Sequence, residues 1–335
     1  MALAKKTAND TTDLYKLLLA DADTTVGATS DIKLVATLQL DPAVNTASHS
    51  FAAGATQTGN FNVDDIISGG SGDDWLYGLG GNDTLFGVGG NDVLHGGAGA
   101  DIMFGGTGID TISYQYSTSV IINLGIHAAS GGDAEGDQFW EVENVIGSDD
   151  ADWIYGDSGD NFLDGEGGTD VMWGGGGNDY LFGGDEHDTL WGEEGDDTLA
   201  GGNGPDELFG GLGDDQLFGG SGGDNLYGND GNDRIDGGGG VDIMEGGDGA
   251  DTFVHYAALP DMGDLITDFD PLEDILELHG IANADDPNVQ LIQNDDGDAQ
   301  LNFSGGGSLT LQDVHVSATD TVADLAQQIT IDYVA

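Results

Sequence analysis

Residues 210–238 read GGLGDDQLFGGSGGDNLYGNDGNDRIDGG, a stretch in which one nine-residue unit repeats. Each unit begins with Gly, carries a second Gly at position four and Asp at position six, and places an aliphatic residue at position eight. Glycines at positions one and four permit positive φ and close backbone approach, so we expect the first six residues to form a tight turn. The last three positions predict a short β-strand whose middle side chain points inward.

The same unit fills two long blocks of the chain. Five units cover residues 69–113, and twelve cover 147–254 without slippage. In these 17 units position one is always Gly, position eight is always aliphatic, Met or Phe, and position six is Asp except at Asn161. Gly also occupies position four except at Asp150 and Glu186. An acidic, Gly-rich chain is usually a disordered linker, but a phase this strict favours a repeat fold.

The charge of the chain calls for a counter-ion. Its 335 residues include 63 Asp plus Glu against 5 Lys plus Arg, a formal net charge of -58. This charge excludes nucleic acid as a partner and keeps the chain expanded unless it is neutralised. Stacked turns would bring carboxylates and carbonyl oxygens together, and such hard ligands suit Ca²⁺ better than Zn²⁺ or Mg²⁺. Because one buried side chain per nine residues is a thin core, we expect metal binding to supply folding free energy.

The unit GGxGxDxUx, where U is aliphatic, resembles the nonapeptide of the RTX (repeats-in-toxin) calcium-binding proteins. The resemblance covers residues 60–335 and implies an all-β fold, a parallel β-roll or β-solenoid. In such a roll two nonapeptides form one coil and Ca²⁺ lies between successive turns. If each site joins unit n to unit n+2, the two blocks hold about 13 Ca²⁺. The resemblance implies as ligands the position-six aspartates Asp74, Asp83, Asp92, Asp101, Asp110, Asp152, Asp170, Asp179, Asp188, Asp197, Asp206, Asp215, Asp224, Asp233, Asp242 and Asp251.

The repeats also divide the chain into parts. We expect an N-terminal cap or docking segment at 1–59, a first RTX block at 60–113, a spacer at 114–146, a second RTX block at 147–254, and a β-rich C-terminal cap with a type I secretion signal at 255–335. Within the spacer, VIINL predicts a strand, and NFSGGGSLTL in the C-terminal part predicts a β-hairpin.

Aromatic residues recur at position nine of alternate units. Residues 18 apart in a two-unit coil stack at about 4.8 Å, the spacing of strands in a sheet. One sheet of the second block would then carry an outward file of Tyr155, Trp173, Trp191, Phe209 and Tyr227. The other sheet would carry a mixed file of Asp164, Phe182, Ala200, Phe218 and Asp236. Because exposed apolar patches mark interfaces, we predict that the aromatic file is an interface for self-association or for binding a surface glycan. The alternative is that the stacked rings only stiffen the sheet.

Signals of catalysis and of membrane insertion are missing from the sequence. There is no HExxH or GxSxG motif, there is no Cys, and 59 N-terminal residues are too few for a catalytic domain, so we predict no enzyme. The apolar run at 17–20 is too short for a secretory signal peptide, and no segment has the length of a membrane span.

These observations predict a secreted, calcium-binding structural or cell-surface protein. We expect it to leave through a type I secretion apparatus without an N-terminal signal peptide and to fold when it meets Ca²⁺ outside the cell. Self-assembly would make it part of a surface layer, an extracellular fibre or a biofilm matrix. The alternatives are a monomeric adhesin or glycan-binding module, and an accessory module of a separately encoded secreted enzyme.

Overall fold

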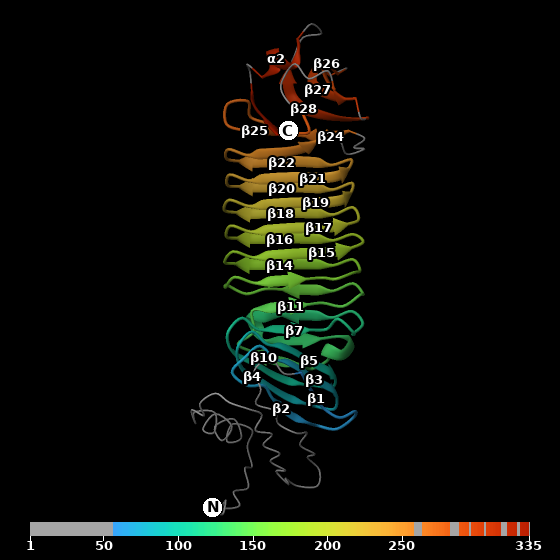
Figure 1. The fold of residues 1–335 in the computed structure, drawn as a ribbon, viewed down its shortest axis with the longest axis vertical. Coiled ribbons are helices and arrows are strands. Elements are labelled where there is room, and N and C mark those ends of the chain that lie inside the picture. The colour runs from blue at the N-terminus through green and yellow to red at the C-terminus, as the bar shows by residue number, and fades with distance from the viewer. Residues whose placement is uncertain are drawn as a thin grey trace, which may run out of the picture.

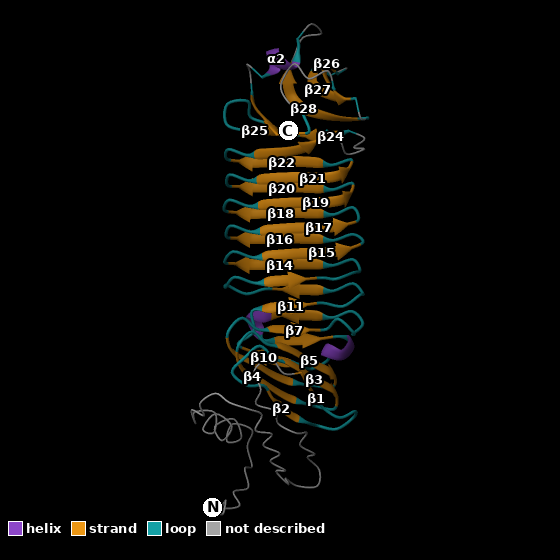
Figure 2. Cartoon of the chain, viewed as in Figure 1, coloured by secondary structure: helices purple, strands orange, loops and turns teal. Residues whose placement is uncertain are grey.

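The described part of the chain is a tall stack of β-coils (Figure 1). The computed structural model describes residues 56–257, 263–281, 288–294, 296–304, 306–315, 320–326 and 329–334. The expected N-terminal segment lies outside these residues up to position 55. The all-β parallel β-roll implied by the sequence is confirmed, and helix is confined to short turns (Figure 2).

Consecutive strands alternate between two sheets, so each sheet gains one strand per coil. Strands 18 residues apart pair in parallel: Leu190 lies opposite Leu208 in one sheet, and Leu199 lies opposite Leu217 in the other. Sheet A consists, in spatial order, of β1 (Thr56–Thr58), β3 (Trp75–Gly80), β5 (Val93–Ala98), β7 (Thr111–Ser113), β11 (Asn144–Ile146), β13 (Phe162–Asp164), β15 (Tyr180–Asp185), β17 (Thr198–Asn203), β19 (Gln216–Gly222), β21 (Arg234–Gly240), β23 (Thr252–Tyr256), β25 (Ile275–His279) and β29 (Thr330–Val334).

Sheet B faces sheet A across the core and also runs the length of the stack. It consists, in spatial order, of β2 (Ile66–Ser68), β4 (Thr84–Gly89), β6 (Ile102–Thr107), β10 (Gln138–Trp140), β9 (Ala128–Ser130), β8 (Ile121–Asn123), β12 (Trp153–Tyr155), β14 (Val171–Gly176), β16 (Thr189–Glu194), β18 (Glu207–Leu212), β20 (Asn225–Asp230), β22 (Ile243–Asp248), β24 (Asp264–Ile266), β28 (Gly307–His315), β27 (Asp298–Phe303) and β26 (Val289–Gln293). The position-eight residues of both sheets meet inside, and Leu190, Leu199 and Leu208 are fully buried.

Most strands of the repeat blocks are longer than the three residues that the sequence predicts. Strand β18, for example, continues through Gly210, Gly211 and Leu212, the first three positions of the next unit. The pairing explains the difference, because Gly211 lies opposite Asn229 and Leu212 opposite Asp230 in the ladder. Only positions four to six therefore form the turn.

The spacer is a built-in coil that joins the two repeat blocks. Strand β11 pairs in parallel with β7 before it and β13 after it, so sheet A is unbroken. In sheet B, β10 pairs with β6, while β9 and β8 add an antiparallel hairpin before β12. The predicted VIINL strand is β8; the 3-10 turn η1 (Leu124–Ile126) follows it directly, and the 3-10 turn η2 (Gly132–Ala134) comes between β9 and β10. Both blocks therefore share one continuous roll.

The described C-terminal residues close the far end of the roll. Strands β24, β25 and β29 continue the parallel sheets. Strands β26, β27 and β28 form antiparallel pairs, which confirms the predicted hairpin, with Leu301 opposite Leu309. The short helix α2 (Val322–Leu325) begins at a capping box of Thr321 and Asp324. Covering the last coil protects its edge from pairing with other chains.

Candidate metal centre

The position-six aspartates form a buried row along each sheet. In most of the row one carboxylate oxygen, Oδ1, accepts a hydrogen bond from the backbone N–H of the aspartate two units earlier; Asp152 accepts from Val120 instead, and Asp179 from Asn161. Asp197 thus donates to Asp215 at 2.7 Å, and Asp215 donates to Asp233 at 2.8 Å. This is the unit n to n+2 spacing that the sequence predicts for the sites. All sixteen predicted ligands are buried, and none is more than 3% exposed.

The second oxygen, Oδ2, is buried without a hydrogen-bond donor in most of the row. Burying a charged oxygen without a partner is costly, and this cost recurs at almost every coil. The orphaned oxygens belong to Asp83, Asp92, Asp101, Asp110, Asp170, Asp179, Asp188, Asp197, Asp206, Asp215, Asp224 and Asp233. A cation between the coils is the group that such oxygens lack.

The position-one glycines keep a space open beside these oxygens. A Cβ atom built on Gly219 would lie 2.5 Å from Oδ2 of Asp224 and 2.6 Å from the carbonyl oxygen of Gly237, two units further on. A carboxylate oxygen and a carbonyl oxygen thus face the same glycine. The same pair of contacts recurs at Gly210, which faces Asp215 and Gly228.

The structure confirms the expected positive φ at position four and corrects the role expected of the position-one glycines. Positive φ occurs at positions two and four, as at Gly211 (126°) and Gly213 (127°). The position-one residues Gly210 and Gly219 are not among the residues with positive φ. Position one needs Gly because a side chain would fill the space between the oxygens, and not because of its backbone angles.

Burial governs the electrostatics of the row. Desolvation raises the pKa of Asp170 to about 8, with Asp188 and Asp152 adding repulsion. Desolvation likewise raises the pKa of Asp215 to about 7, with Asp197 and Asp233 as its repelling neighbours. The N–H donor on Oδ1 lowers each pKa but does not offset burial. Without a cation, the folded row therefore disfavours its own ionised form.

These donors fit Ca²⁺. Among the described residues, no three His, Cys, Asp or Glu side chains gather closely enough to hold a metal by themselves. A cation here would be held by carboxylates together with backbone carbonyls, which are the mixed hard oxygen ligands typical of Ca²⁺. When bound, the ion would supply the positive charge that the orphaned oxygens lack.

The family model of the RTX calcium-binding nonapeptide repeat (4 copies) matches residues 61–94, 77–112, 146–181, 173–208, 182–217, 191–226 and 218–253. The chain belongs to the RTX family. RTX repeats bind calcium and are typical of exported proteins. Across the described part of this RTX chain, no helix is both long and apolar enough to cross a membrane.

Two solved structures are similar to this RTX chain over part of their length. The AlgE6R3 subunit of the Azotobacter vinelandii mannuronan C5-epimerase is 34% identical, with 37% of this chain and 76% of that chain covered and a TM-score of 0.27. The extracellular lipase LipA of Serratia marcescens is 22% identical, with 56% of this chain and 39% of that chain covered and a TM-score of 0.25. No curated protein sequence matches the chain. The family therefore rests on the repeats.

The spacer of the RTX roll continues the row with a carboxylate that the sequence analysis missed. Asp137 accepts the N–H of Asp101 on Oδ1 at 2.7 Å, and its Oδ2 accepts the hydroxyl of Tyr114 at 2.9 Å. A signal was present, because GDAEGDQFW at 132–140 keeps Gly, Asp and an apolar residue at positions one, six and eight. Here a protein hydroxyl, rather than a cation, satisfies the second oxygen.

Other carboxylates extend the row at the ends of the repeat blocks. Glu143 accepts the N–H of Asp110, and Asp264 and Asp274 accept those of Asp242 and Asp251. They lie outside the regular nine-residue phase, so counting units could not find them.

We expect Tyr114→Phe to destabilise the calcium-loaded protein by about 1–3 kcal/mol, because Oδ2 of Asp137 would lose its donor while remaining buried. The measurement is the thermal midpoint in excess Ca²⁺. Tyr116→Phe is the matched control, since Tyr116 is 70% exposed, and should leave the midpoint unchanged. Equal midpoints for the two variants would contradict the role given to Tyr114.

We expect acid to favour the metal-free fold. The pKa of Asp215 and Asp170 is about 7 and about 8 in the folded state, above the ordinary value of 3.8. The folded row therefore binds more protons than the unfolded chain, and its stability falls as the pH rises from about 4 to 8. In EGTA, circular dichroism should show more β-structure at pH 5 than at pH 8. Light scattering on dilute samples excludes aggregation. An equal β-structure signal at pH 5 and pH 8 would contradict the prediction.

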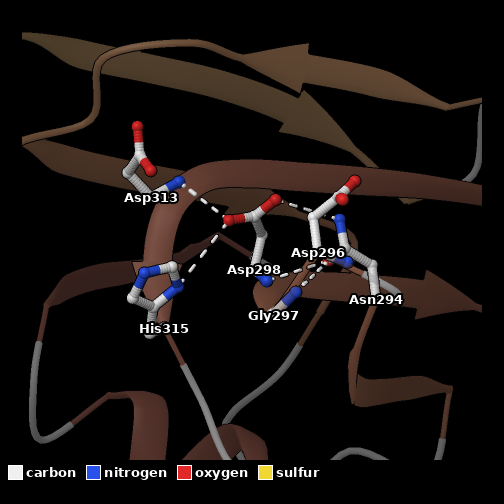
Figure 3. A network of polar contacts seen from close by, with 6 residues as sticks. All are labelled: Asn294, Asp296, Gly297, Asp298, Asp313 and His315. Carbon is white, nitrogen blue, oxygen red and sulfur yellow. Dashed lines mark hydrogen bonds and ion pairs between the residues drawn. The ribbon is translucent and has the colours of Figure 1, made fainter.

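A second acidic cluster lies in the C-terminal cap, at the β26–β27 turn (Figure 3). Both carboxylate oxygens of Asp298 have donors: Oδ1 accepts the Asp313 N–H at 3.0 Å, and Oδ2 accepts Nδ2 of Asn294 at 3.1 Å. Nδ1 of His315 lies 3.8 Å from Oδ1. With these partners, Asp298 lacks the open oxygen that distinguishes the repeat aspartates.

The five predicted aromatic residues of sheet B stack in one file on the outside of the RTX roll. Tyr155 and Trp173 have ring centroids 4.3 Å apart, and Trp173 and Trp191 are 4.9 Å apart. Phe209 lies 5.5 Å from Trp191 and 4.9 Å from Tyr227. Neighbouring rings are within 7° of parallel, so each covers its neighbours and is half-buried. The use of this file as an interface remains a prediction.

Proposed function

We propose that this RTX chain is a secreted, non-catalytic structural protein whose roll folds when Ca²⁺ binds outside the cell. The row of buried, unpartnered Oδ2 oxygens carries the proposal. Where Ca²⁺ is scarce, the net charge of -58 keeps the chain open for export. Extracellular Ca²⁺ modules bind at about 10⁻⁴–10⁻³ M, a range in which export itself would trigger folding.

We propose the position-six aspartates as ligands, with the ions held inside each repeat block. At the start of the two blocks, Oδ2 of Asp74 accepts the N–H of Gly70, and Oδ2 of Asp152 accepts that of Ser148. Backbone donors thus take part of the role of a cation at these two positions. The number of ions, about 13 from unit counting, is to be measured by calorimetric titration.

The proposed role outside the cell is assembly through the aromatic file of sheet B, into a surface layer, a fibre or a biofilm matrix. The file is a continuous stripe of stacked rings on the outer face of sheet B, and exposed apolar stripes mark interfaces. Bound Ca²⁺ would also reduce the repulsion between two chains of the same charge. Export by a type I secretion apparatus fits this role and belongs to the same proposal.

The test is light scattering and sedimentation velocity during a Ca²⁺ titration. The wild-type chain should first fold and then assemble, and Trp173→Ser with Trp191→Ser should fold but stay monomeric. The matched control is Phe162→Ser with Tyr180→Ser, which removes a stacked pair from the outer face of sheet A and should leave assembly intact. A loaded wild-type chain that stays monomeric would favour the adhesin or accessory-module alternative.

A further inference from the structure

A shallow trough of about 490 Å³ lies on the outer face of sheet A, over strands β15, β17 and β19. Its floor is backbone, because Gly184, Gly202 and Gly220 lie opposite one another in consecutive strands. These three glycines have positive φ and carry no side chain, and Gly202 and Gly220 reach the surface, so a flat ligand can approach the main chain there.

One side of the trough is a row of polar side chains held in place by hydrogen bonds. Nδ2 of Asn203 donates to Oδ1 of Asp185 at 2.8 Å, and Oγ of Ser221 donates to Oδ1 of Asn203 at 2.8 Å. All three side chains are exposed. Each retains further capacity to donate or accept, so the row is a pre-ordered set of hydrogen-bonding groups.

The other side of the trough is aromatic. Phe182 lines it and is 37% exposed. In the register of sheet A, Ala200 lies opposite Phe182, and Phe218 follows one strand further on. The small side chain of Ala200 separates the two rings, so Phe182 is not covered as the rings of the sheet B file are.

We propose that this trough binds a neutral oligosaccharide. A pyranose ring has an apolar face that can lie against Phe182 and an edge of hydroxyls that can bond to Asp185, Asn203 and Ser221. Binding sites of this kind pair apolar surface with a few fixed polar groups. The strands repeat at about 4.8 Å, which is close to the length of one pyranose unit, so successive sugars can meet successive strands.

The charge of the trough selects against anionic sugars. Glu166 and Asp185 both line it, and no Lys or Arg does so. A uronate or sulfate group would therefore meet carboxylates without a counter-charge. The site needs the folded roll but not self-assembly, so it goes beyond the function proposed above.

The experiment is calorimetric titration of the calcium-loaded full chain. The probes are tetrasaccharides of glucose, mannose, xylose, galactose and N-acetylglucosamine, with tetragalacturonate as the anionic probe. At least one neutral tetrasaccharide should bind, and tetragalacturonate should not. Phe182→Ala and Asn203→Ala should each weaken binding about tenfold. Tyr180→Ala is the control, because Tyr180 is an exposed ring of strand β15 that does not line the trough, and it should bind as the wild type does.

The proposal is overturned if no neutral probe binds, if only tetragalacturonate binds, or if Tyr180→Ala weakens binding as much as Phe182→Ala. Circular dichroism in Ca²⁺ checks that each variant is folded. If Phe182→Ala does not fold, the Asn203→Ala variant tests the proposal instead, since the side chain of Asn203 is exposed and lies outside the core. Light scattering on the same samples separates a failure of this site from a failure of assembly.

Discussion

Removal of Ca²⁺ with EGTA at neutral pH is expected to abolish most of the β-sheet signal in circular dichroism, and excess Ca²⁺ should restore it. Each coil holds only two position-eight side chains, such as Leu190 and Leu199, in its core. Its buried carboxylates, such as Asp215 and its neighbours, repel one another. Without a cation, the free-energy cost of burying them exceeds what this thin core can offset.

Two controls show whether the effect belongs to bound Ca²⁺. Sodium chloride at high concentration screens the net charge and should not restore the sheet by itself. Mg²⁺ should restore little, because it demands small octahedral sites and gives up its water reluctantly. A spectrum that is unchanged in EGTA would remove the basis of the proposed folding switch.

Gly219→Ala is expected to destabilise the calcium-loaded roll by about 3 kcal/mol and to lower its calcium content. The new methyl group would lie 2.5 Å from Oδ2 of Asp224 and 2.6 Å from the carbonyl oxygen of Gly237. The carboxylate of Asp224 cannot move away without breaking the row, since its Oδ1 accepts the N–H of Asp206 at 2.9 Å. The two measurements are the thermal midpoint in Ca²⁺ and calorimetric titration.

The matched control is Gly239→Ala, the same substitution at position three of the unit that lies two units further along the roll. A Cβ atom at Gly239 meets nothing within 4 Å, so this variant should change the stability by no more than about 0.5 kcal/mol. If both variants behave alike, the position-one glycines do not keep a metal site open.

Much of the fold could be predicted from the sequence because it is periodic. The phase of Asp215, Leu217 and their equivalents predicted the buried row and the core, and the 18-residue coil predicted the stack of Trp173 on Trp191. Periodicity could not predict where it breaks. The unit at 132–140 keeps the positions that place Asp137 in the row, but the hairpin of β8 and β9 that precedes it carries no nine-residue signal.

The details of the candidate site also lie beyond the repeat. Asp137 and Asp215 occupy equivalent places in the row. Tyr114 donates a hydrogen bond to Oδ2 of Asp137, whereas Oδ2 of Asp215 has no donor. The tyrosine lies 23 residues before its partner and reaches it only through the tertiary fold. The trough beside Phe182 likewise depends on residues 18 apart that become neighbours when the strands pair.

The sequence by itself determined the family, the coil and the calcium-binding type of the repeat, because each follows from residue type and spacing within a local repeat. Only the tertiary structure decided which carboxylate oxygens are left without a donor, that the two blocks form one roll, and where the outer face is hollow. Those properties depend on contacts between successive coils. A repeat specifies each coil almost identically, whereas the contacts also depend on the irregular residues between and beside the repeats.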